Sequence, residues 1–345
     1  MVTIKQIASS VGVSSATVSR VLNFDQTLSV SAQTRQSIIE TAEALNYATP
    51  RNRNRPKIKP GTATKIALVH FLRPDQELAD PYYVSLRLGI ESRAAALQIE
   101  TVKIYHTDDL PDPKTLKSTA GVIAIGPHSP DEVNWLKRHS HLVVFADFAP
   151  PDDTVDSVHS DRSLAMRRLM AALTAAHYHR IGFVGWWDNA HAGGGAVYEE
   201  RGLAYVNWLR EAGNFDPAIC AFEANTEESG YKLTKQVLSQ PVPPDVLIAG
   251  NDNMAVGAYR AIHELGLRIP DDIAVASFND ISVAQFLNPP LTTVRLPSEE
   301  IGETAVDLLV EQIDGRDYAK QAILASRIVW RGSARRPKDD GLPPR

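Results

Sequence analysis

The chain has 345 residues, 43% of them hydrophobic and 22% charged, a composition that excludes a disordered chain and suggests two or three folded units. A single cysteine excludes an internal disulfide framework, no apolar run approaches the ~18 residues that span a bilayer, and no secretion signal opens the sequence, so we expect a cytoplasmic protein without a membrane partner. The net charge of −5 hides an asymmetry. Residues 1–60 contain eight Lys or Arg and three acidic residues, whereas the remainder contains 28 Lys or Arg and 38 acidic residues. This distribution predicts that only the amino-terminal part of the chain binds a polyanion.

The basic head, residues 1–49, has the spacing of three helices. Four apolar residues predict the first helix: Ile4, Ile7, Ala8 and Val11. Gly12 can adopt the positive φ that ends it, and Ser14 is placed as the N-cap of a second helix over 16–22. A third helix begins near Ser31, with a buried stripe of Ile38, Ile39, Ala42 and Leu45. This pattern predicts a helix-turn-helix unit, although an ordinary three-helix bundle has the same spacing.

The second helix of the head separates small polar residues from apolar ones. Its inward residues are Val18, Val21 and Leu22, and its outward residues are Ser15, Ala16, Ser19 and Arg20. Small side chains permit close approach to base edges, and an arginine can pair with guanine through two hydrogen bonds, which contributes ~1–3 kcal/mol of base discrimination. These features favour DNA binding over a plain bundle.

The stretch I-x-x-I-A-x3-G-V-S-x-A-T-V-S-R-V-L-N closely resembles the amino-terminal signature of the LacI/GalR family of transcriptional repressors. In that family the second helix reads double-stranded operator DNA. The resemblance implies that Ser15, Ala16 and Arg20 read bases. It also implies that Ser14, Thr17 and Ser19 lie near phosphates.

Residues 50–62 contain PRNRNRPKIKPG, with a basic residue at every second position. The segment has three possible roles: a loose linker, a phosphate-binding strip, or a region that folds on a partner. The resemblance places it at the family's hinge, which in relatives forms a short helix and wedges a leucine into the minor groove. Here that position falls near Arg55 or Pro56, and proline disfavours a helix interior. We therefore expect an extended hinge with Arg51, Arg53 and Arg55 in the minor groove or on phosphates.

Residues 63–334 alternate short apolar runs with amphipathic stretches. The predicted strands are 65–71, 100–106, 121–126, 142–147, 180–186, 245–250 and 272–278. The predicted helices include 82–98, 161–178, 199–212, 228–239 and 253–265. This alternation predicts doubly wound parallel sheets, and because the segment exceeds one comfortable core we expect an α/β body of two lobes.

Ligands of such sheets bind beyond the carboxyl ends of the strands. Polar or aromatic residues stand at four of these ends: Asp147, Trp186–Trp187–Asp188, Asn251–Asp252 and Asn279–Asp280. Arg201 lies on a following helix. Amides and carboxylates can bind sugar hydroxyls while an indole covers the apolar sugar face. Each residue alone can instead be a helix cap or part of the core.

The family resemblance continues through GNDNMAVGAYRAIHELGLRIPDDIAVASFND and PPLTTVR. It implies a periplasmic-binding-protein-like body that the chain crosses three times, with lobe one at 63–161 and 291–323 and lobe two at 162–290 and 324–334. By position, the family's usual effector contacts fall on Asp147, Arg201, Asn251 and Asn279. Asn279 stands where many members carry Asp, and an amide both donates and accepts.

Residues 80–91 and 106–126 are similar to the branch of the family that includes the repressor of the evolved β-galactosidase operon. That likeness implies a galactoside-like sugar effector and places Tyr82 near the cleft, where Trp186 is also expected. Packing beneath its own helix is the other reading of Tyr82.

Catalytic and metal chemistry find little support in the sequence. The pairs His139-x-His141 and His177-x-His179 lack accompanying cysteines or carboxylates, and Gly193–Gly195 is not followed by the Lys-Ser/Thr of a nucleotide loop. We expect no enzyme activity, no metal and no cofactor. The tail, 335–345, has no leucine heptad, which favours a homodimer over a tetramer.

The sequence thus predicts a repressor of a carbohydrate operon. Two alternatives remain open: a purine- or nucleotide-responsive repressor of the same fold, and a stand-alone sugar-binding protein.

Overall fold

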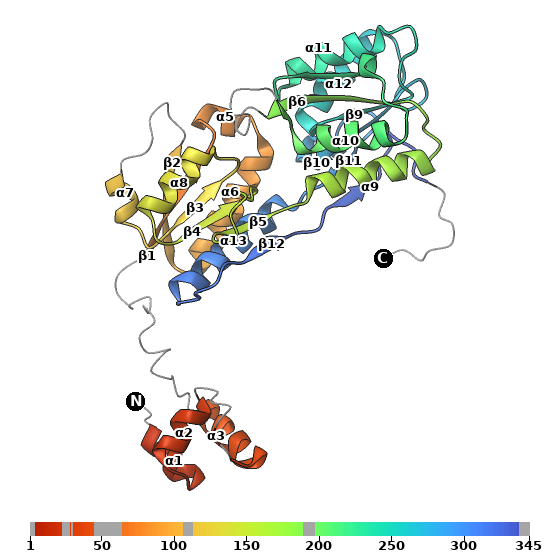
Figure 1. The fold of residues 1–345 in the computed structure, drawn as a ribbon. Helices are drawn as coiled ribbons and strands as arrows, with labels where there is room; N and C mark the ends of the chain where they lie inside the picture. Colours follow the sequence, from red (N-terminus) through yellow and green to blue (C-terminus); the bar gives the residue numbers. More distant parts are fainter. Residues whose placement is uncertain are drawn as a thin grey trace. The chain divides into compact units, whose positions relative to one another are not determined.

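A computed structural model describes residues 4–22, 28, 30–44, 64–105, 113–188 and 197–337 (Figure 1). Within these ranges the side chains of residues 22, 32, 39, 40, 42–44, 188, 197 and 198 are not described. The chain divides into two compact units, Met1–Lys59 and Pro60–Arg345.

The first unit contains the three predicted helices, α1 (Ile4–Val11), α2 (Ser15–Leu22) and α3 (Ala32–Ala44). Their shared core is formed by Ile7, Ala8, Val18, Val21 and Ile38. Gly12 has φ +72°, and the Ser14 hydroxyl oxygen accepts the backbone N–H of Thr17 at 3.0 Å, which confirms the predicted turn and N-cap. The other expected stripe residues, Ile39, Ala42 and Leu45, lie outside the described side chains.

Lobe one of the second unit is built on an all-parallel sheet of order β12-β5-β4-β3-β1-β2. Its strands are β1 (Thr64–His70), β2 (Ile99–Tyr105), β3 (Val122–Ile125), β4 (Val143–Ala146), β5 (Asp156–His159) and β12 (Gln321–Ile323). Its helices are α5 (Pro74–Leu78), α6 (Pro81–Ala96), α7 (Pro113–Lys117), α8 (Pro130–His139) and α13 (Ser298–Ile313). Helices α6 and α13 cover one face of this sheet. They pack so closely that a Cβ added at Gly302 would lie 2.2 Å from the backbone oxygen of Leu86.

Lobe two is built on a second sheet of order β13-β11-β10-β9-β6-β7, with β8 also paired to β6. Its strands are β6 (Ile181–Asp188), β7 (Val197–Tyr198), β8 (Cys220–Glu223), β9 (Val246–Ala249), β10 (Ala274–Asn279), β11 (Thr292–Arg295) and β13 (Arg327–Val329). Its α-helices are α9 (Arg162–Ala175), α10 (Glu200–Glu211), α11 (Glu227–Leu238) and α12 (Asp252–Glu264). Two 3-10 turns, η1 (Pro217–Ile219) and η2 (Ser282–Gln285), complete it.

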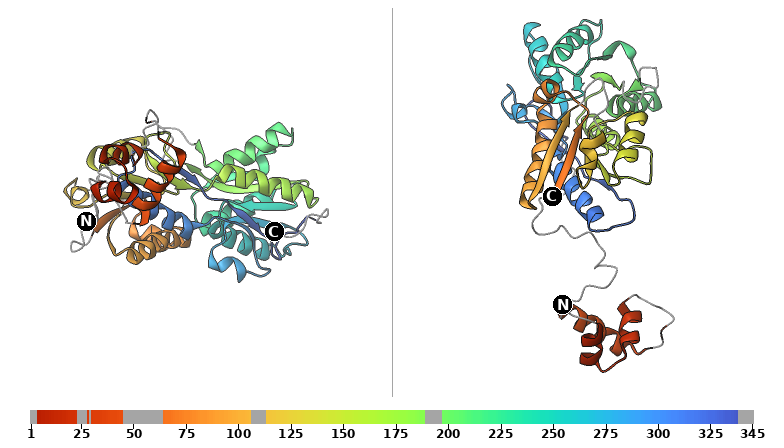
Figure 2. Two further views of the ribbon diagram at one scale, coloured as in Figure 1. Left: turned by 90° about the horizontal axis from the view of Figure 1, so that it is seen from below. Right: turned by 90° about the vertical axis from the view of Figure 1, so that its left-hand side faces the viewer.

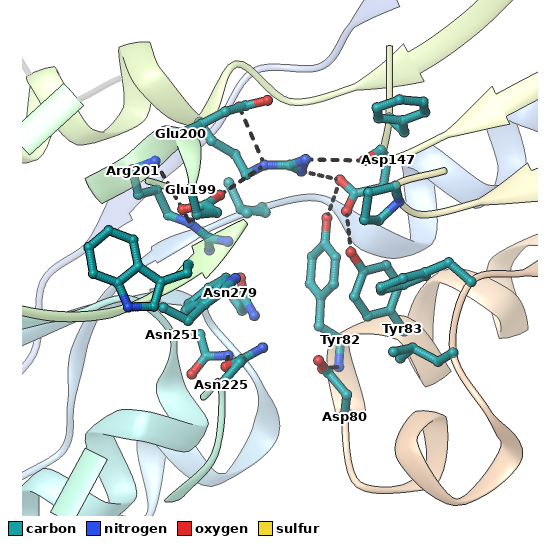
Figure 3. Close-up of a pocket in the computed structure, with 18 residues that line it drawn as sticks. Asp80, Tyr82, Tyr83, Asp147, Glu199, Glu200, Arg201, Asn225, Asn251 and Asn279 are labelled. Atoms are coloured by element: carbon teal, nitrogen blue, oxygen red, sulfur yellow. Dashed lines mark hydrogen bonds and ion pairs between the residues drawn. The ribbon is translucent and has the colours of Figure 1, made fainter. Parts of the chain in front are cut away.

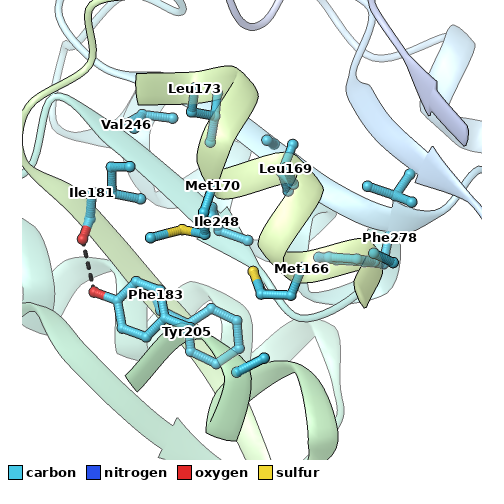
Figure 4. Packing of buried hydrophobic residues seen from close by; sticks show 14 of the residues in the cluster. Met166, Leu169, Met170, Leu173, Ile181, Phe183, Tyr205, Val246, Ile248 and Phe278 are labelled. Carbon is cyan, nitrogen blue, oxygen red and sulfur yellow. Dashed lines mark hydrogen bonds between the residues drawn. The ribbon is translucent and has the colours of Figure 1, made fainter. Parts of the chain in front are cut away.

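Helices cover both faces of the lobe-two sheet, as a doubly wound fold requires. Figure 4 shows Met166, Leu169, Met170 and Leu173 of α9 lying against strand residues such as Val246 and Ile248. The Tyr205 hydroxyl donates to the Ile181 carbonyl at 2.7 Å, so the polar group of a fully buried ring is satisfied. Helices α11 and α12 bury a separate cluster on the opposite face.

The chain passes between the lobes three times, after β5, after β11 and after β12 (Figures 1 and 2). The Ser160 hydroxyl donates to the Leu324 carbonyl at 3.0 Å and thereby ties the first crossing to the third. The predicted boundary at 291 is wrong: β11 pairs with β10 and β13, so it belongs to lobe two and the second crossing falls near 296–297. Thr292 and Thr293 are fully buried there, and their polarity concealed the strand in the sequence.

Among the described residues, no helix is both long enough and apolar enough to span a bilayer.

Candidate functional site

A cavity of about 310 Å³ lies between the two lobes of the second unit (Figure 3). Its lining includes all six residues predicted to contact the effector: Tyr82, Asp147, Trp186, Arg201, Asn251 and Asn279. These residues come from α6, β6, α10 and the carboxyl ends of β4, β9 and β10, which confirms that the polar strand ends meet at one place.

The lobe-one wall centres on Asp147, whose side chain is almost fully buried. The Tyr82 hydroxyl donates to its Oδ1 at 2.9 Å, and the Tyr83 hydroxyl donates to its Oδ2 at 3.2 Å. Burial, followed by the adjacent Asp147 carboxylate, raises the pKa of both phenols well above the usual value, so they remain donors. Asp147 has φ +60°, a conformation that aspartate adopts more readily than most residues.

Arg162 connects the two walls from the first position of α9. Its Nη1 lies 2.8 Å from Asp147 Oδ1, and its Nη2 donates to the Asp147 carbonyl at 3.1 Å. On the other side, its Nε lies 3.6 Å from Glu199 Oε1 and 3.5 Å from Glu200 Oε2. Burial alone would lower the pKa of Arg162, but these three carboxylates raise it well above the usual value. The lobes are therefore joined by an ionic network that is exposed only at Glu200.

The lobe-two wall centres on Arg201, which is 6% exposed. Its Nε donates to Glu199 Oε2 at 2.9 Å, and its guanidinium carbon lies 4.6 Å from the centre of the Trp186 ring. Burial tends to raise the pKa of Glu199, but the neighbouring Arg201 and Arg162 lower it overall. The Arg201 Nη1 is buried and has no hydrogen-bond partner among the described residues. A ligand oxygen in the cavity can supply the missing acceptor.

Three asparagines continue this wall. Asn251 caps α12, since its Oδ1 accepts the backbone N–H of Met254 at 3.0 Å, and its Nδ2 donates to Asn225 Oδ1. Asn279 ends β10 with φ +106° and lines the cavity. Asn251 therefore both caps α12 and lines the cavity.

The two walls differ in chemistry. In Figure 3, Arg201, Asn225, Asn251 and Asn279 stand across the cavity from Asp80, Tyr82 and Tyr83. Burial raises the pKa of the Asp80 carboxyl to about 6, and that group also caps α6 by accepting the Tyr82 N–H at 3.1 Å. The cavity can hold a neutral, polyhydroxylated molecule with its polar edge on lobe two and an apolar face on the aromatic rings of lobe one.

Sequence reasoning missed five polar lining residues: Asp80, Arg162, Glu199, Glu200 and Asn225. Asp80 and Glu199 begin helices as N-caps, and Arg162 occupies a first helical turn, where charged residues are ordinary. The sequence predicts that an indole covers the apolar face of the sugar. In the structure the Arg201 guanidinium instead lies over one face of the Trp186 ring.

In the first unit, the exposed side of α2 carries the residues predicted to read DNA. Ser15, Ala16 and Arg20 are exposed, Ser19 is partly exposed, and Val18 and Val21 face the core, as predicted. The Ser14 and Thr17 hydroxyls lie 2.8 Å apart and bond one another. The hinge arginines Arg51, Arg53 and Arg55 lie outside the described residues, as does the Gly193–Gly195 loop.

The part of the chain that the structure describes contains no cluster of His, Cys, Asp or Glu suited to a metal ion. His139, one of the histidines considered from the sequence, instead places its Nδ1 2.8 Å from the carbonyl of Trp135 on the same helix.

Comparison with known proteins agrees with this architecture. Residues 3–50 match the family described as bacterial regulatory proteins of the lacI family, and residues 170–334 match a periplasmic binding protein-like domain. The HTH-type transcriptional regulator GalR of Lacticaseibacillus casei is 35% identical over 337 residues, which cover 97% of this chain and 100% of that protein. The lactose operon repressor of Rhizobium radiobacter is 59% identical over 110 residues, 32% of this chain and 97% of the compared sequence.

A solved complex of the transcriptional regulator CelR with cellobiose has a TM-score of 0.67 and 25% identity, covering 97% of this chain and 100% of the other. Because the relative from L. casei is similar over nearly its whole length, this chain belongs to the lacI family of bacterial regulatory proteins.

Proposed function

We propose that this chain is a transcriptional repressor of a carbohydrate operon, which binds double-stranded operator DNA as a homodimer and responds to a galactoside-like sugar. The observation that carries the sugar assignment is the buried Arg201 guanidinium, whose Nη1 has no acceptor among the residues that the structure describes. Sugar hydroxyls are acceptors as well as donors, so they match this group and the neighbouring amides.

A sugar fits the cavity better than a purine. A purine would need an open aromatic face for stacking, and of the two indoles in the lining, Trp186 already has the Arg201 guanidinium carbon 4.6 Å from its ring centre. The names of two similar proteins point the same way, because one is a lactose operon repressor and the other was solved with cellobiose.

The residue roles follow from position and chemistry. Arg201, Asn251 and Asn279 would bind hydroxyls from lobe two, and Trp186 would hold Arg201 in place. Asp147 accepts hydrogen bonds from Tyr82, Tyr83 and Arg162, so at most part of its capacity is open to the effector. Its principal role would be to fix the two tyrosines that form the opposite wall.

For the head, Ser15, Ala16 and Arg20 would reach base edges while Ser14, Thr17 and Ser19 lie near phosphates. The hinge arginines Arg51, Arg53 and Arg55 would add phosphate contacts, each steepening the salt dependence of binding by roughly 0.9 log units. A two-fold dimer then reads two half-sites of a pseudo-palindromic operator. These roles describe a cytoplasmic regulator without catalytic activity.

Effector control requires only a modest coupling energy. A sugar that favours one arrangement of the lobes by about 1–3 kcal/mol would change operator affinity by roughly 5–150-fold. The Arg162 network spans both lobes beside the cavity, so it is placed to differ between those arrangements.

The proposal is tested by thermal unfolding in the presence of lactose, melibiose, galactose and cellobiose, with hypoxanthine and guanine as the purine set. Binding of a galactoside raises the unfolding temperature by mass action, and the shift grows with ligand concentration. Stabilisation by a purine alone would replace the sugar assignment with the purine one. Release of glucose or galactose from lactose in proportion to purified protein would contradict the non-enzymatic role.

A further inference from the structure

Another carboxyl group, that of Asp252, adjoins the wall residue Asn251 and takes no part in lining the cavity. The side chain is fully buried in lobe two at the start of α12. Hydroxyls of Ser277 and Thr293 donate to its Oδ1, the latter at 2.8 Å, and the backbone N–H of Ile281 donates to its Oδ2 at 2.8 Å. Among the described residues, no Lys, Arg or His forms a salt bridge with it. The described groups that bond this carboxyl are all neutral donors.

The Ile281 bond fixes an unusual turn at the cavity. Asn279 and Asp280 have φ of +106° and +59°, in the left-handed region that residues with a side chain adopt less readily than glycine. Two further contacts support the turn: Asp280 N–H donates to Thr293 Oγ1 at 3.3 Å, and Arg331 Nη2 lies 2.6 Å from Asp280 Oδ1. Thr293 therefore bonds both Asp252 and the turn residue Asp280.

We propose that Asp252 is a positioning residue that holds Asn279 in its cavity-facing conformation and thereby sets the affinity for the effector. The inference rests on the proposed function for the identity of the effector. The hydrogen bonds that connect Asp252 to the turn at Asn279 are local and continuous. Asp252 bonds Ile281 and Thr293, Thr293 bonds Asp280, and Asp280 adjoins Asn279. Asn251, the N-cap of the same helix, lines the cavity. The start of α12 therefore supplies one wall residue, Asn251, and the support of a second wall residue, Asn279.

The geometry separates a positioning role from simple stabilisation. In Asp252→Asn, the amide oxygen can still accept the Ile281 N–H while its NH₂ faces two hydroxyl oxygens that can rotate to accept. In Asp252→Ala both supports disappear. Thr293→Val removes the hydroxyl that bonds Asp252 and Asp280, whereas Thr293→Ser retains it.

The neighbouring threonine provides a matched control. Thr292 is on the same strand, is equally buried and has a bonded hydroxyl, but its partners are backbone groups of Arg331. Thr292→Val should therefore lower stability to a similar extent while leaving in place the bonds that Thr293 makes to Asp252 and Asp280.

The test is calorimetric titration of each variant with lactose and with melibiose, well below its unfolding temperature, paired with amide hydrogen exchange of the ligand-free protein. Thr293→Val and Asp252→Ala should raise the dissociation constant about tenfold or more and speed exchange at Asp280 and Ile281. Asp252→Asn, Thr293→Ser and Thr292→Val should stay within about twofold of the parent dissociation constant.

The outcomes separate the two proposals. If neither sugar binds the parent protein, the sugar assignment fails, and the exchange rates still decide whether Asp252 and Thr293 hold the turn. Unchanged exchange at Asp280 and Ile281 in both Thr293→Val and Asp252→Ala would overturn the positioning role. So would parental sugar affinity in those two variants.

Discussion

Arg162 Nη1 lies 2.8 Å from Asp147 Oδ1, in an ion pair that joins the first turn of a lobe-two helix to the end of a lobe-one strand. The Asp147 side chain is 1% exposed and that of Arg162 is 12% exposed. The same guanidinium faces Glu199 and Glu200, so it compensates three carboxylates around the cavity. The contact is therefore both a support of the wall and a link between the lobes.

Replacing Arg162 should destabilise the protein strongly. Arg162→Met leaves buried carboxylates without their counter-charge, which typically costs about 3–5 kcal/mol. The free energy of unfolding, measured by urea denaturation, should fall by that amount. Arg93→Met is the control, because Arg93 pairs with Asp307 at 2.7 Å but both side chains are well exposed, and such pairs contribute about 0–1 kcal/mol. Equal losses in the two variants would contradict the importance of the buried network.

Arg201→Lys should abolish the response to sugar while leaving the fold intact. Lysine keeps the charge but cannot bond Glu199, cover Trp186 and extend a second nitrogen at the same time. The apparent affinity for lactose, obtained from the thermal shift at increasing lactose concentration, should fall by at least about tenfold. On the same helix, Arg210 is exposed and lies over Phe215 at 5.1 Å, so Arg210→Lys should respond as the parent does. A parental response in Arg201→Lys would remove Arg201 from the site.

Arg20→Ala should relax base preference in the operator. The operator is first obtained by selection from random duplexes with the parent protein, and the selection is then repeated with the variant. Loss of one arginine–guanine pair should cost about 1–3 kcal/mol and remove the preference at one position of each half-site. Lys5, exposed on α1, provides the control Lys5→Ala. An unchanged preference in Arg20→Ala would show that this arginine does not read a base.

Asp252 should make stability depend on pH in an unusual direction. Burial raises the pKa of this carboxyl to about 7, whereas an unfolded aspartate titrates near 3.9. The native state therefore retains a proton that the unfolded state has lost, so the contribution to stability is complete below about pH 4 and is lost as the pH rises through 7.

The free energy of unfolding, measured with urea, should therefore fall in the parent relative to Asp252→Asn as the pH rises from about 4 to about 7. The expected slope is up to about 1.4 kcal/mol per pH unit. Other groups cancel in the difference, including His70, whose pKa burial lowers to about 4. The surface variant Asp271→Asn, at an exposed side chain, serves as the control. A difference that is constant from pH 5 to pH 8 would contradict an ionisable, buried Asp252.

The sequence allowed the long, regular parts of the fold to be predicted. Strands such as 181–188 and 274–279 are mostly apolar. Asp147, Asn251 and Asn279 stand at or just beyond the ends of strands, so sheet geometry alone brings them together. Short strands escaped: β5 has the sequence DSVH and β11 has TTVR, and their polar residues become buried only because neighbouring strands satisfy them. That omission shifted one lobe boundary by several residues.

Other site residues could not be predicted because their roles depend on tertiary contacts. Arg162 and Asp147 are brought into contact by the first crossing between lobes, and no periodicity encodes that contact. Asp252 looks like an ordinary first-turn acid beside Asn251, and only the fold shows that its oxygens face Thr293 and Ile281. Local sequence patterns specify elements, whereas the ionic and hydrogen-bonded supports of a cavity are specified by packing.

The central claim is that a sugar bound in the cavity controls operator binding. Its most direct test is fluorescence anisotropy of a labelled, selection-derived operator duplex at fixed salt, titrated with the protein in the absence and presence of saturating lactose or melibiose. We predict that the sugar weakens operator binding by roughly 5–150-fold in the parent protein and has no effect on the Arg201→Lys variant. Sugar binding demonstrated by calorimetry together with unchanged operator affinity would contradict the account.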